Sequence, residues 1–222
     1  EVERITQRSA HGLAGRLRVG FVNSMLYRGL PRAVQRFEAD HPAVEIILRE
    51  MNTGEQVQAI QRQQIDLGCA YWGTFPAEVV STPIFSEPFL VCLPAGHALA
   101  RRKSLALDAL EQAPFILFPR TVSPHYHDLI IALCVDAGFS PVIRHEARLW
   151  QTVVTMVGFG MGVALVPKTL QHAGDARVSF VPLAGGKKES PVLSLRRTGD
   201  AEPVASRFLE YLEAAAQENV KP

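Results

Sequence analysis

Between residues 17 and 71 the chain alternates strand-like and helix-like segments, and this alternation restricts the possible folds more than any other feature. Short apolar, β-branched runs are typical of strands, and they occur at Leu17–Val22, Val44–Leu48 and Asp66–Tyr71. Apolar residues at helical spacing fill the two gaps: Leu30, Val34 and Phe37, then Val57 and Ile60. Two successive strand–helix–strand units require a parallel sheet with helices on both faces. This part is therefore predicted to be an α/β lobe.

The pattern starts again after Pro83, which predicts a second α/β lobe. Strands are expected at Phe89–Leu93, Phe115–Phe118 and Val163–Val166, and helices at Leu129–Gly138 and Trp150–Val157. Near the end, Val192–Arg196 has the character of a strand, and an apolar stripe over residues 204–212 predicts a last helix. The length of 222 residues and the hydrophobic content of 47% are enough for two modest cores.

Charge and cysteine content exclude several classes of protein. The net charge is +1 without any long block of like charge, so this chain by itself is expected to bind DNA poorly. Cys69, Cys92 and Cys134 lie far apart in apolar surroundings, which indicates core residues in a reducing compartment. No run reaches the roughly 20 apolar residues of a membrane helix, and the first 15 residues do not form an intact signal peptide. We expect a cytoplasmic protein without a membrane partner, although a cleaved signal would leave no trace.

Motifs for catalysis, metals and nucleotides are weak. Gly158–Gly162 is glycine-rich, but a helix precedes it and a strand follows, the reverse of a dinucleotide loop. His125 and His127 lack further ligands at convincing spacing, and no G-x-S-x-G elbow is present. The sequence therefore predicts no enzyme, no catalytic residue, no metal and no cofactor.

Five stretches, in their order and spacing, carry a resemblance to a known family. They are Arg16–Gly20, Leu30–Glu45, Gln64–Gly68, Leu93–Leu99 and Val157–Pro167. Together they resemble the effector-binding domain of LysR-type transcriptional regulators, nearest to the benzoate- and muconate-responsive branch.

The resemblance implies a fold like that of type II periplasmic binding proteins, with two Rossmann-like lobes joined by two crossover strands and a ligand cleft between them. It assigns residues 16–86 and 193–222 to lobe I and residues 87–192 to lobe II. Residues 1–15 would be the remnant of a linker helix. The winged helix-turn-helix that precedes this linker in the family is expected to be absent from the chain.

Ligands of open α/β sheets lie at the carboxyl ends of strands, where helix N-termini favour anions. In lobe I this places Asn23 and Ser24 after the first strand. Thr53 follows the second strand, and with Gln56 it fits a capping box that starts the next helix, so Thr53 is placed at a strand end as well. Resemblance favours effector contacts by Ser24 and Thr53, although each residue could instead only cap its helix. Tyr71 stands where several aromatic-acid-responsive relatives carry Arg, which favours a monoacid or a more neutral effector over a diacid.

In lobe II, resemblance points to Pro124, His125 and Tyr126, which precede or begin a helix, and to Gln151, which follows Trp150. Two alternatives remain open: the ring of Tyr126 packs in the helix stripe, or Gln151 is a solvated helix position.

The expected function is effector sensing for a transcriptional regulator, with a small inducer, preferably a carboxylate, bound between the lobes. The alternative is a periplasmic solute-binding protein for a small anion. Resemblance also implies a homodimer through the sensing domain, a homotetramer at full length, and promoter DNA bound by the missing N-terminal domain. The segments Arg28–Phe37 and Leu129–Gly138 are candidates for the dimer interface, unless their outer faces are merely solvated.

Overall fold

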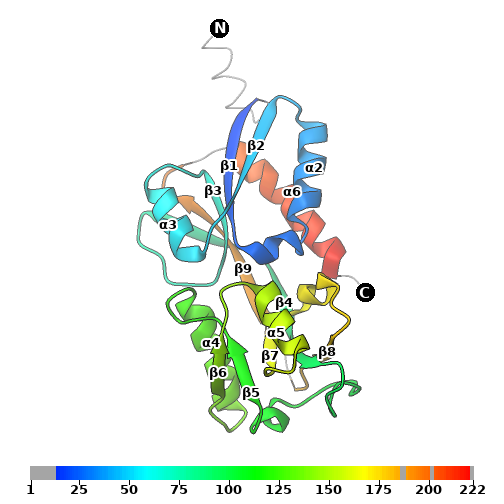
Figure 1. Cartoon of the computed structure of the whole chain (residues 1–222). Coiled ribbons are helices and arrows are strands. Elements are labelled where there is room, and N and C mark those ends of the chain that lie inside the picture. The colour runs from blue at the N-terminus through cyan, green and yellow to red at the C-terminus, as the bar shows by residue number, and fades with distance from the viewer. Residues whose placement is uncertain (1–13, 186–188, 201–202, 221–222) are drawn as a thin grey trace. The chain divides into compact units, whose positions relative to one another are not determined.

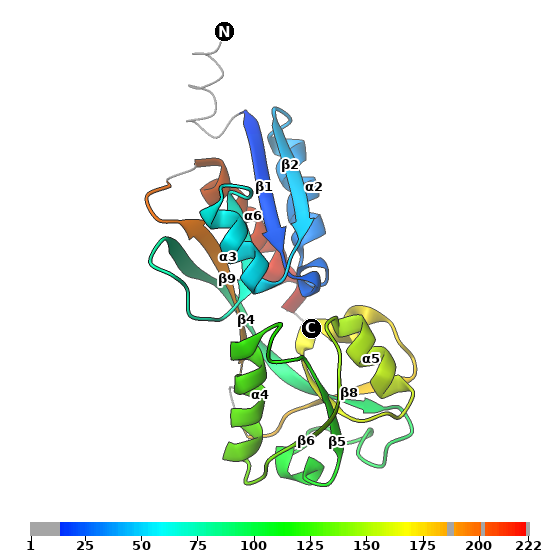
Figure 2. The same cartoon turned by 60° about the vertical axis from the view of Figure 1, so that its left-hand side comes forward.

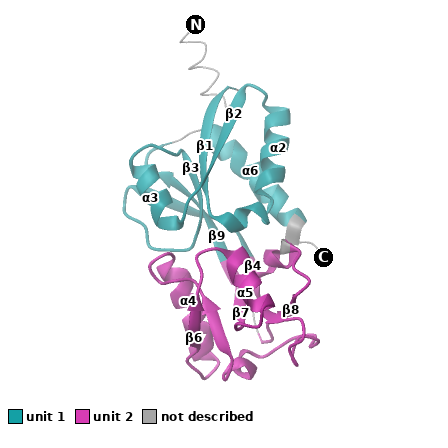
Figure 3. Ribbon diagram, in the orientation of Figure 1, with its two compact units in different colours: residues 1–86, 191–222 teal, residues 87–190 magenta. Residues whose placement is uncertain are grey.

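The computed structural model describes residues 14–185, 189–200 and 203–220 (Figure 1). The chain forms two compact units, unit 1 from residues 1–86 and 191–222 and unit 2 from residues 87–190 (Figure 3). It passes from unit 1 to unit 2 within β4 (Val79–Pro94) and returns within β9 (Glu189–Arg197). The expected linker remnant, residues 1–15, lies outside the described residues apart from Ala14 and Gly15.

Unit 1 is built on three parallel strands, β1 (Gly15–Phe21), β2 (Val44–Glu50) and β3 (Leu67–Tyr71). Their order in the sheet is β2-β1-β3, with β9 antiparallel to β3. Helix α3 (Thr53–Gln61) lies on one face of the sheet, and α2 (Leu30–Asp40) and α6 (Pro203–Val220) lie on the other (Figures 1 and 2). This is the parallel α/β arrangement that the alternating sequence predicts.

Helix α6 closes unit 1 by packing on α2. Phe37 of α2 is fully buried, and its ring meets Phe208 and Tyr211 of α6 at centroid distances of 5.4 and 5.2 Å. At the surface, Arg36 forms an ion pair with Glu218 at 2.7 Å. The chain enters α2 through Gly29, whose φ of 97° favours glycine, and leaves it at Asp40 before the His41-Pro42 pair.

Unit 2 contains a parallel pair, β5 (Pro114–Leu117) and β6 (Val142–Glu146), and an antiparallel set in which β4 pairs with β7 (Ala164–Pro167) and β8 (Val178–Pro182). Helices α4 (Pro124–Asp136) and α5 (Trp150–Gly158) follow the two parallel strands. Short 3-10 helices η2 (Leu107–Leu110) and η3 (Lys168–Ala173) complete the unit. Its core includes Phe115, Ile130 and Val153, each at most 1% exposed.

The glycine-rich stretch after α5 is a tight connection, as predicted. Helix α5 ends at Gly158, and Gly160 has a φ of 75°, in the region that favours glycine. A Cβ on Gly162 would lie 2.6 Å from the carbonyl oxygen of Pro114, so the chain passes directly against β5 at that point. Within the described ranges, no helix has the length and apolar character needed to cross a membrane.

Candidate functional site

The carboxyl ends of the three parallel strands of unit 1 lie side by side. Phe21 of β1 is paired with Glu50 of β2 and with Cys69 of β3. Beyond these pairs, Met51 N donates to Phe21 O at 3.0 Å and Val22 N donates to Cys69 O at 3.1 Å. The residues at these strand ends therefore lie along one edge: Asn23 and Ser24 follow β1, Thr53 follows β2, and Tyr71 ends β3. In the sheet order β2-β1-β3, β2 lies on one side of β1 and β3 on the other, so the order in which the strands are connected reverses at β1. Sheets of this kind bind ligands at such a reversal.

Ser24, Tyr71 and Arg28 form a buried polar cluster at this edge. Ser24 lies in the 3-10 helix η1 (Asn23–Leu26) that follows β1, and its Oγ is 2.5 Å from Tyr71 Oη. Arg28 Nη1 donates to Ser24 Oγ at 2.8 Å, and its guanidinium lies over the Tyr71 ring at 5.2 Å from the centroid. Ser24 and Arg28 are fully buried, and Tyr71 is 7% exposed.

The cap of α3 differs from the prediction. The N-cap is Asn52, whose side chain accepts from Glu55 N at 2.9 Å, while Asn52 N donates to Glu55 Oε2 at 2.8 Å. The predicted capping box of Thr53 with Gln56 is wrong by one residue, because Asn-x-x-Glu fits the reciprocal geometry and places Thr53 inside the first turn. The alternative considered for Ser24, that it only caps a helix, is wrong, since η1 begins after Val22 without a side-chain cap.

Gln56 takes a different structural role. It is fully buried, and its Nε2 donates to Met51 O at 3.0 Å and to Cys69 O at 3.2 Å. One amide thus connects the segment after β2 to the end of β3. Gln56 holds the strand ends in register beneath the candidate site.

Two oxygen atoms of the predicted site residues in unit 1 are buried without an intramolecular hydrogen bond in the described part of the chain. They are Asn23 Oδ1 and Thr53 Oγ1. An unsatisfied buried polar group costs about 1–3 kcal/mol, and such groups in native proteins commonly mark a bound partner or a functional site. Because Asn52 and not Thr53 caps α3, the hydroxyl of Thr53 has no structural role within the helix.

In unit 2, the carboxyl ends of β5 and β6 are paired at Leu117 and Glu146, and α4 and α5 begin after them. Pro124 and Gln151 are exposed, and His125 is half-buried. Tyr126 is 3% exposed, and its ring lies 5.4 Å from that of Trp150 and 5.8 Å from that of Phe89. The ring packs in the aromatic core, which favours the alternative considered for it, and contact with an effector by any of these residues stays a prediction.

Sequence reasoning did not identify Arg28. The residue interrupts the apolar stretch Met25–Leu30, in which Met25 and Leu30 are fully buried, and it is four positions from Ser24. A charged residue within an apolar stretch was the available signal.

The structure gives little support to catalysis by the remaining groups. Burial raises the pKa values of the Cys69 and Cys92 thiols to about 12, so both are protonated at neutral pH and are poor nucleophiles. Asp128, beside His127, is exposed, and a hydrogen bond from Arg120 lowers its pKa to about 2. No group of three or more potential metal ligands occurs in the part of the chain that the structure describes.

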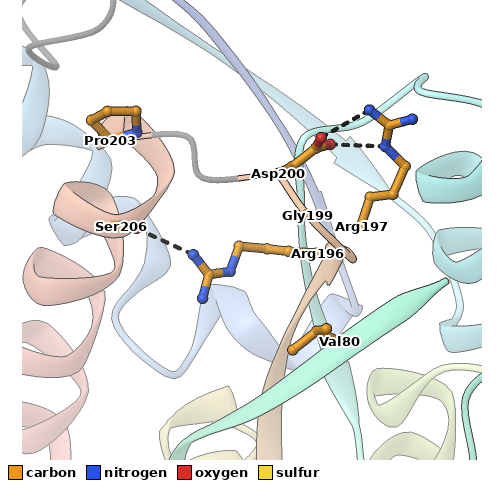
Figure 4. A pocket seen from close by; sticks show the side chains of 7 residues that line it. All are labelled: Val80, Arg196, Arg197, Gly199, Asp200, Pro203 and Ser206. Atoms are coloured by element: carbon orange, nitrogen blue, oxygen red, sulfur yellow. Dashed lines mark hydrogen bonds and ion pairs between the residues drawn. The ribbon is translucent and has the colours of Figure 1, made fainter. Parts of the chain in front are cut away.

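A surface pocket of about 390 Å³ lies between β9 and the start of α6, far along the strand from the edge described above (Figure 4). Its charged side chains are already engaged with near neighbours. Arg197 donates to both carboxylate oxygens of Asp200 at 2.9 and 2.8 Å, and Arg196 Nη1 donates to Ser206 Oγ at 3.2 Å. The charged side chains that line this pocket therefore have partners within the protein, and the strand ends remain the better candidate site.

Known proteins resemble the chain over most of its length. The family model described as LysR substrate binding domain matches residues 10–217. The HTH-type transcriptional regulator CatR of Pseudomonas putida is 31% identical, over 96% of this chain and 73% of the regulator. BenM of Acinetobacter baylyi, also an HTH-type transcriptional regulator, is 29% identical, over 79% of this chain and 59% of BenM.

Among solved structures, the BenM effector binding domain with its effector benzoate matches with a TM-score of 0.81 and 27% identity, over 93% of this chain and 95% of that chain. This match confirms the predicted fold class, two α/β lobes of the periplasmic-binding-protein type II kind. The resemblance seen in the sequence motifs is likewise confirmed. The chain belongs to the LysR substrate binding domain family.

Proposed function

We propose that this chain binds a small inducer that carries a carboxylate, at the carboxyl edge of β1, β2 and β3, and thereby controls a LysR-type regulator. The observation that carries the proposal is the buried Thr53 hydroxyl at the strand-order reversal, which has no hydrogen-bond partner among the described residues; the buried Asn23 Oδ1 at the same edge only accepts, so it suits a donor group of the inducer. The Thr53 hydroxyl and the first N–H groups of α3 are donors suited to a carboxylate. The effector of BenM in the matching structure is benzoate, which is itself a carboxylate.

Burial of the site couples ligand binding to a conformational change. Ser24 is 0% exposed, so a ligand reaches it only when the site opens. A ligand that prefers one conformation shifts the equilibrium by its differential affinity, and a coupling of about 1–3 kcal/mol is typical. The relatives with which the chain shares its family are transcriptional regulators, which favours this function over solute delivery.

From unit 2 we propose contacts by Pro124, His125 and Gln151, with Tyr126 acting through the edge of its buried ring. These residues begin the helices that follow β5 and β6, and helix N-termini offer unpaired N–H groups. They would complete the recognition of an inducer whose acidic group is held in unit 1.

We further propose that the regulator acts in the cytoplasm as a homotetramer that binds promoter DNA through an N-terminal domain, with sensing domains paired as homodimers. The HTH designation of CatR and BenM supports the DNA-binding step. On α4 the apolar side chain of Val135 is 54% exposed, and on the neighbouring β6 that of Val142 is 65% exposed. On α2, Arg32 and Arg36 already pair with Glu218, so the α4 face is the stronger candidate for the dimer contact.

Thermal unfolding against a panel of aromatic, muconate-like and aliphatic carboxylates tests the proposal. A ligand present at about 100 times its Kd adds roughly 2.7 kcal/mol to the stability of the folded state, which gives a readable shift in Tm. Thr53→Val removes the hydroxyl and keeps the shape of the side chain, whereas the control Thr53→Ser keeps the hydroxyl. A shift that is lost in Thr53→Val and kept in Thr53→Ser supports the site. A folded protein that no acid stabilises would rule out the carboxylate.

A further inference from the structure

Asn23 carries a buried oxygen atom that the local structure does not use. Its Oδ1 has no hydrogen-bond partner among the described residues. An asparagine in a turn commonly accepts from the backbone N–H two residues on, but that N–H belongs to Met25 and donates to Val22 O at 2.9 Å. Asn23 does not cap the 3-10 helix either, because the N-cap of η1 is Val22 and no side chain caps it. No hydrogen bond within the described ranges therefore accounts for the polar end of this side chain.

Asn23 and Thr53 start from neighbouring points of the strand-end edge. The carbonyl of Phe21 accepts from Met51 N at 3.0 Å, which joins the end of β1 to the segment after β2. Asn23 is two residues beyond Phe21, and Thr53 is two residues beyond Met51. Two residues of chain span at most about 7 Å. One small molecule can therefore meet both side chains.

The two unpartnered oxygen atoms differ in what they can bind. A hydroxyl donates as well as accepts, so Thr53 Oγ1 can donate to a carboxylate. An amide oxygen only accepts, so Asn23 Oδ1 repels a carboxylate oxygen and requires an O–H or N–H group. A buried polar atom without a partner is costly, and a ligand that supplies the hydrogen removes that cost. Together the two atoms fit an acid that also carries a hydrogen-bond donor.

We infer that the inducer is a hydroxy or amino acid and that Asn23 selects for its donor group. This inference rests on the proposed function and narrows the inducer from acids in general to acids with an O–H or N–H group besides the carboxylate. Such a molecule needs only one carboxylate. It therefore agrees with the expectation that Tyr71, in place of Arg, favours a monoacid over a diacid.

The test compares acids that differ only in the donor, by isothermal titration calorimetry on this chain. The probes are the ortho, meta and para isomers of hydroxybenzoate and of aminobenzoate, which distinguish the two kinds of donor. Each is paired with the matching fluorobenzoate, whose fluorine has a similar size but no hydrogen to donate. Lactate and propanoate form an aliphatic pair. In the wild type we expect at least one donor-bearing acid to bind about tenfold or more tightly than its partner.

Three variants assign this preference to a residue. Asn23→Leu keeps the approximate shape of the side chain and removes the acceptor, so the donor-bearing acid should lose its advantage over its partner. Asn23→Asp keeps an acceptor and should keep the preference, although its charge weakens the binding of every acid. Thr53→Val removes the donor to the carboxylate and should weaken both members of a pair alike.

The free protein provides a second measurement, made without ligand. Removal of a buried acceptor that has no partner breaks no hydrogen bond, so the Tm of Asn23→Leu should equal or exceed that of the wild type. Thr169→Val is the contrasting control. It removes a buried hydroxyl that donates to Glu87 Oε1 at 3.1 Å and should lower the Tm. A Tm for Asn23→Leu that falls as far as that of the control would show a structural role for Asn23 and overturn the inference.

The outcomes separate this inference from the proposed function. If acids without a donor bind as tightly as those with one, the inference is wrong and the carboxylate site stands. A preference that survives Asn23→Leu would also overturn the role of Asn23. If Thr53→Val leaves binding intact while Asn23→Leu removes the preference, the inference stands and the carboxylate contact of Thr53 is wrong. If no probe binds the folded wild type, both fail.

Discussion

At the scale of single residues, the amide of Gln56 joins strand ends that would otherwise be held only by backbone pairing. Gln56→Leu removes the donor to Met51 O and Cys69 O but also removes Oε1, which has no hydrogen-bond partner among the described residues. We expect a net loss of about 1 kcal/mol in the free energy of unfolding, because the two effects oppose each other. Urea denaturation measures it. The control Gln58→Leu makes the same change on the exposed side of α3 and should be close to neutral. Equal losses of stability in both variants would contradict the role of Gln56 in joining the strand ends.

Gly162 illustrates a steric requirement that is independent of backbone conformation. A Cβ there would meet the backbone oxygen of Pro114 at 2.6 Å, and a backbone atom cannot move aside as a flexible side chain can. Gly162→Ala should therefore lower the free energy of unfolding by about 1–3 kcal/mol. Gly96 has no heavy atom within 4 Å of its added Cβ, so Gly96→Ala is the matched control and should change little. A Tm for Gly162→Ala equal to that of the control would mean that β5 and β7 separate easily.

The role of a single side chain could be predicted where a family motif contains the residue. It was hard to predict where contacts with distant parts of the chain determine that role. Thr53 is close to its helix start in the sequence, yet the choice between Asn52 and Thr53 as cap depends on which residue reaches the N–H of the third helical position. Arg28 lies in an apolar stretch, and only the fold shows that Tyr71, 43 positions later, supplies the ring beneath it.

At the scale of elements, α6 belongs with α2, although the whole of unit 2 separates them in the chain. Phe208 of α6 is fully buried against Phe37, and removal of a large aromatic side chain from a core costs about 3–5 kcal/mol. We expect Phe208→Ala to lower the stability of unit 1 by that amount in urea denaturation. Phe159→Ala, at a ring that is 68% exposed, should cost far less. A loss for Phe208→Ala as small as that expected for Phe159→Ala would mean that α6 contributes little to the core of unit 1.

Helix α4 offers the test of the proposed homodimer. Val135→Asp places a charge on an apolar surface that a partner would cover, and a buried unpaired charge opposes association. Sedimentation equilibrium should show a weaker dimer for this variant than for the wild type. Phe159→Asp, at a more exposed apolar site elsewhere on unit 2, is the control and should leave association unchanged. A wild-type protein that is monomeric at all concentrations would contradict the proposed homodimer for this chain.

Elements with strong periodicity were predicted, whereas strands β6 and β8 were not. In β6, Val-Ile-Arg-His-Glu has only two apolar residues, and the exposed and half-buried positions alternate without a fully buried one. β8 follows a short turn and owes its strand state to pairing with β4 over Leu90–Pro94. The length of β4 was also missed, because Pro83 and Pro88 suggest breaks in what is one strand from Val79 to Pro94. Pairing partners far away in the sequence decided all three cases.

At the scale of the whole molecule, the two units repeat one arrangement. In each, parallel strands end together and the next helices begin there, after β1, β2 and β3 in unit 1 and after β5 and β6 in unit 2. The chain passes between the units within two strands and therefore carries no long flexible linker at either crossing. The proposed effector contacts include residues at these strand ends in each unit.

Hydrogen exchange measured by mass spectrometry, with and without the acid that gives the largest Tm shift, tests the proposed contacts in each unit. Amides in the first turn of a helix have no intrahelical acceptor and exchange by local opening, so a bound ligand protects them selectively. We expect slower exchange in peptides that cover residues 23–28 and 52–58 of unit 1 and in those that cover residues 123–128 and 149–154 of unit 2. Residues 132–138, at the other end of α4, serve as the control and should exchange at an unchanged rate. Protection confined to unit 1 would keep the site at Asn23 and Thr53 and remove Pro124, His125, Tyr126 and Gln151 from it, because a ligand in contact with the first turns of α4 and α5 would slow exchange there.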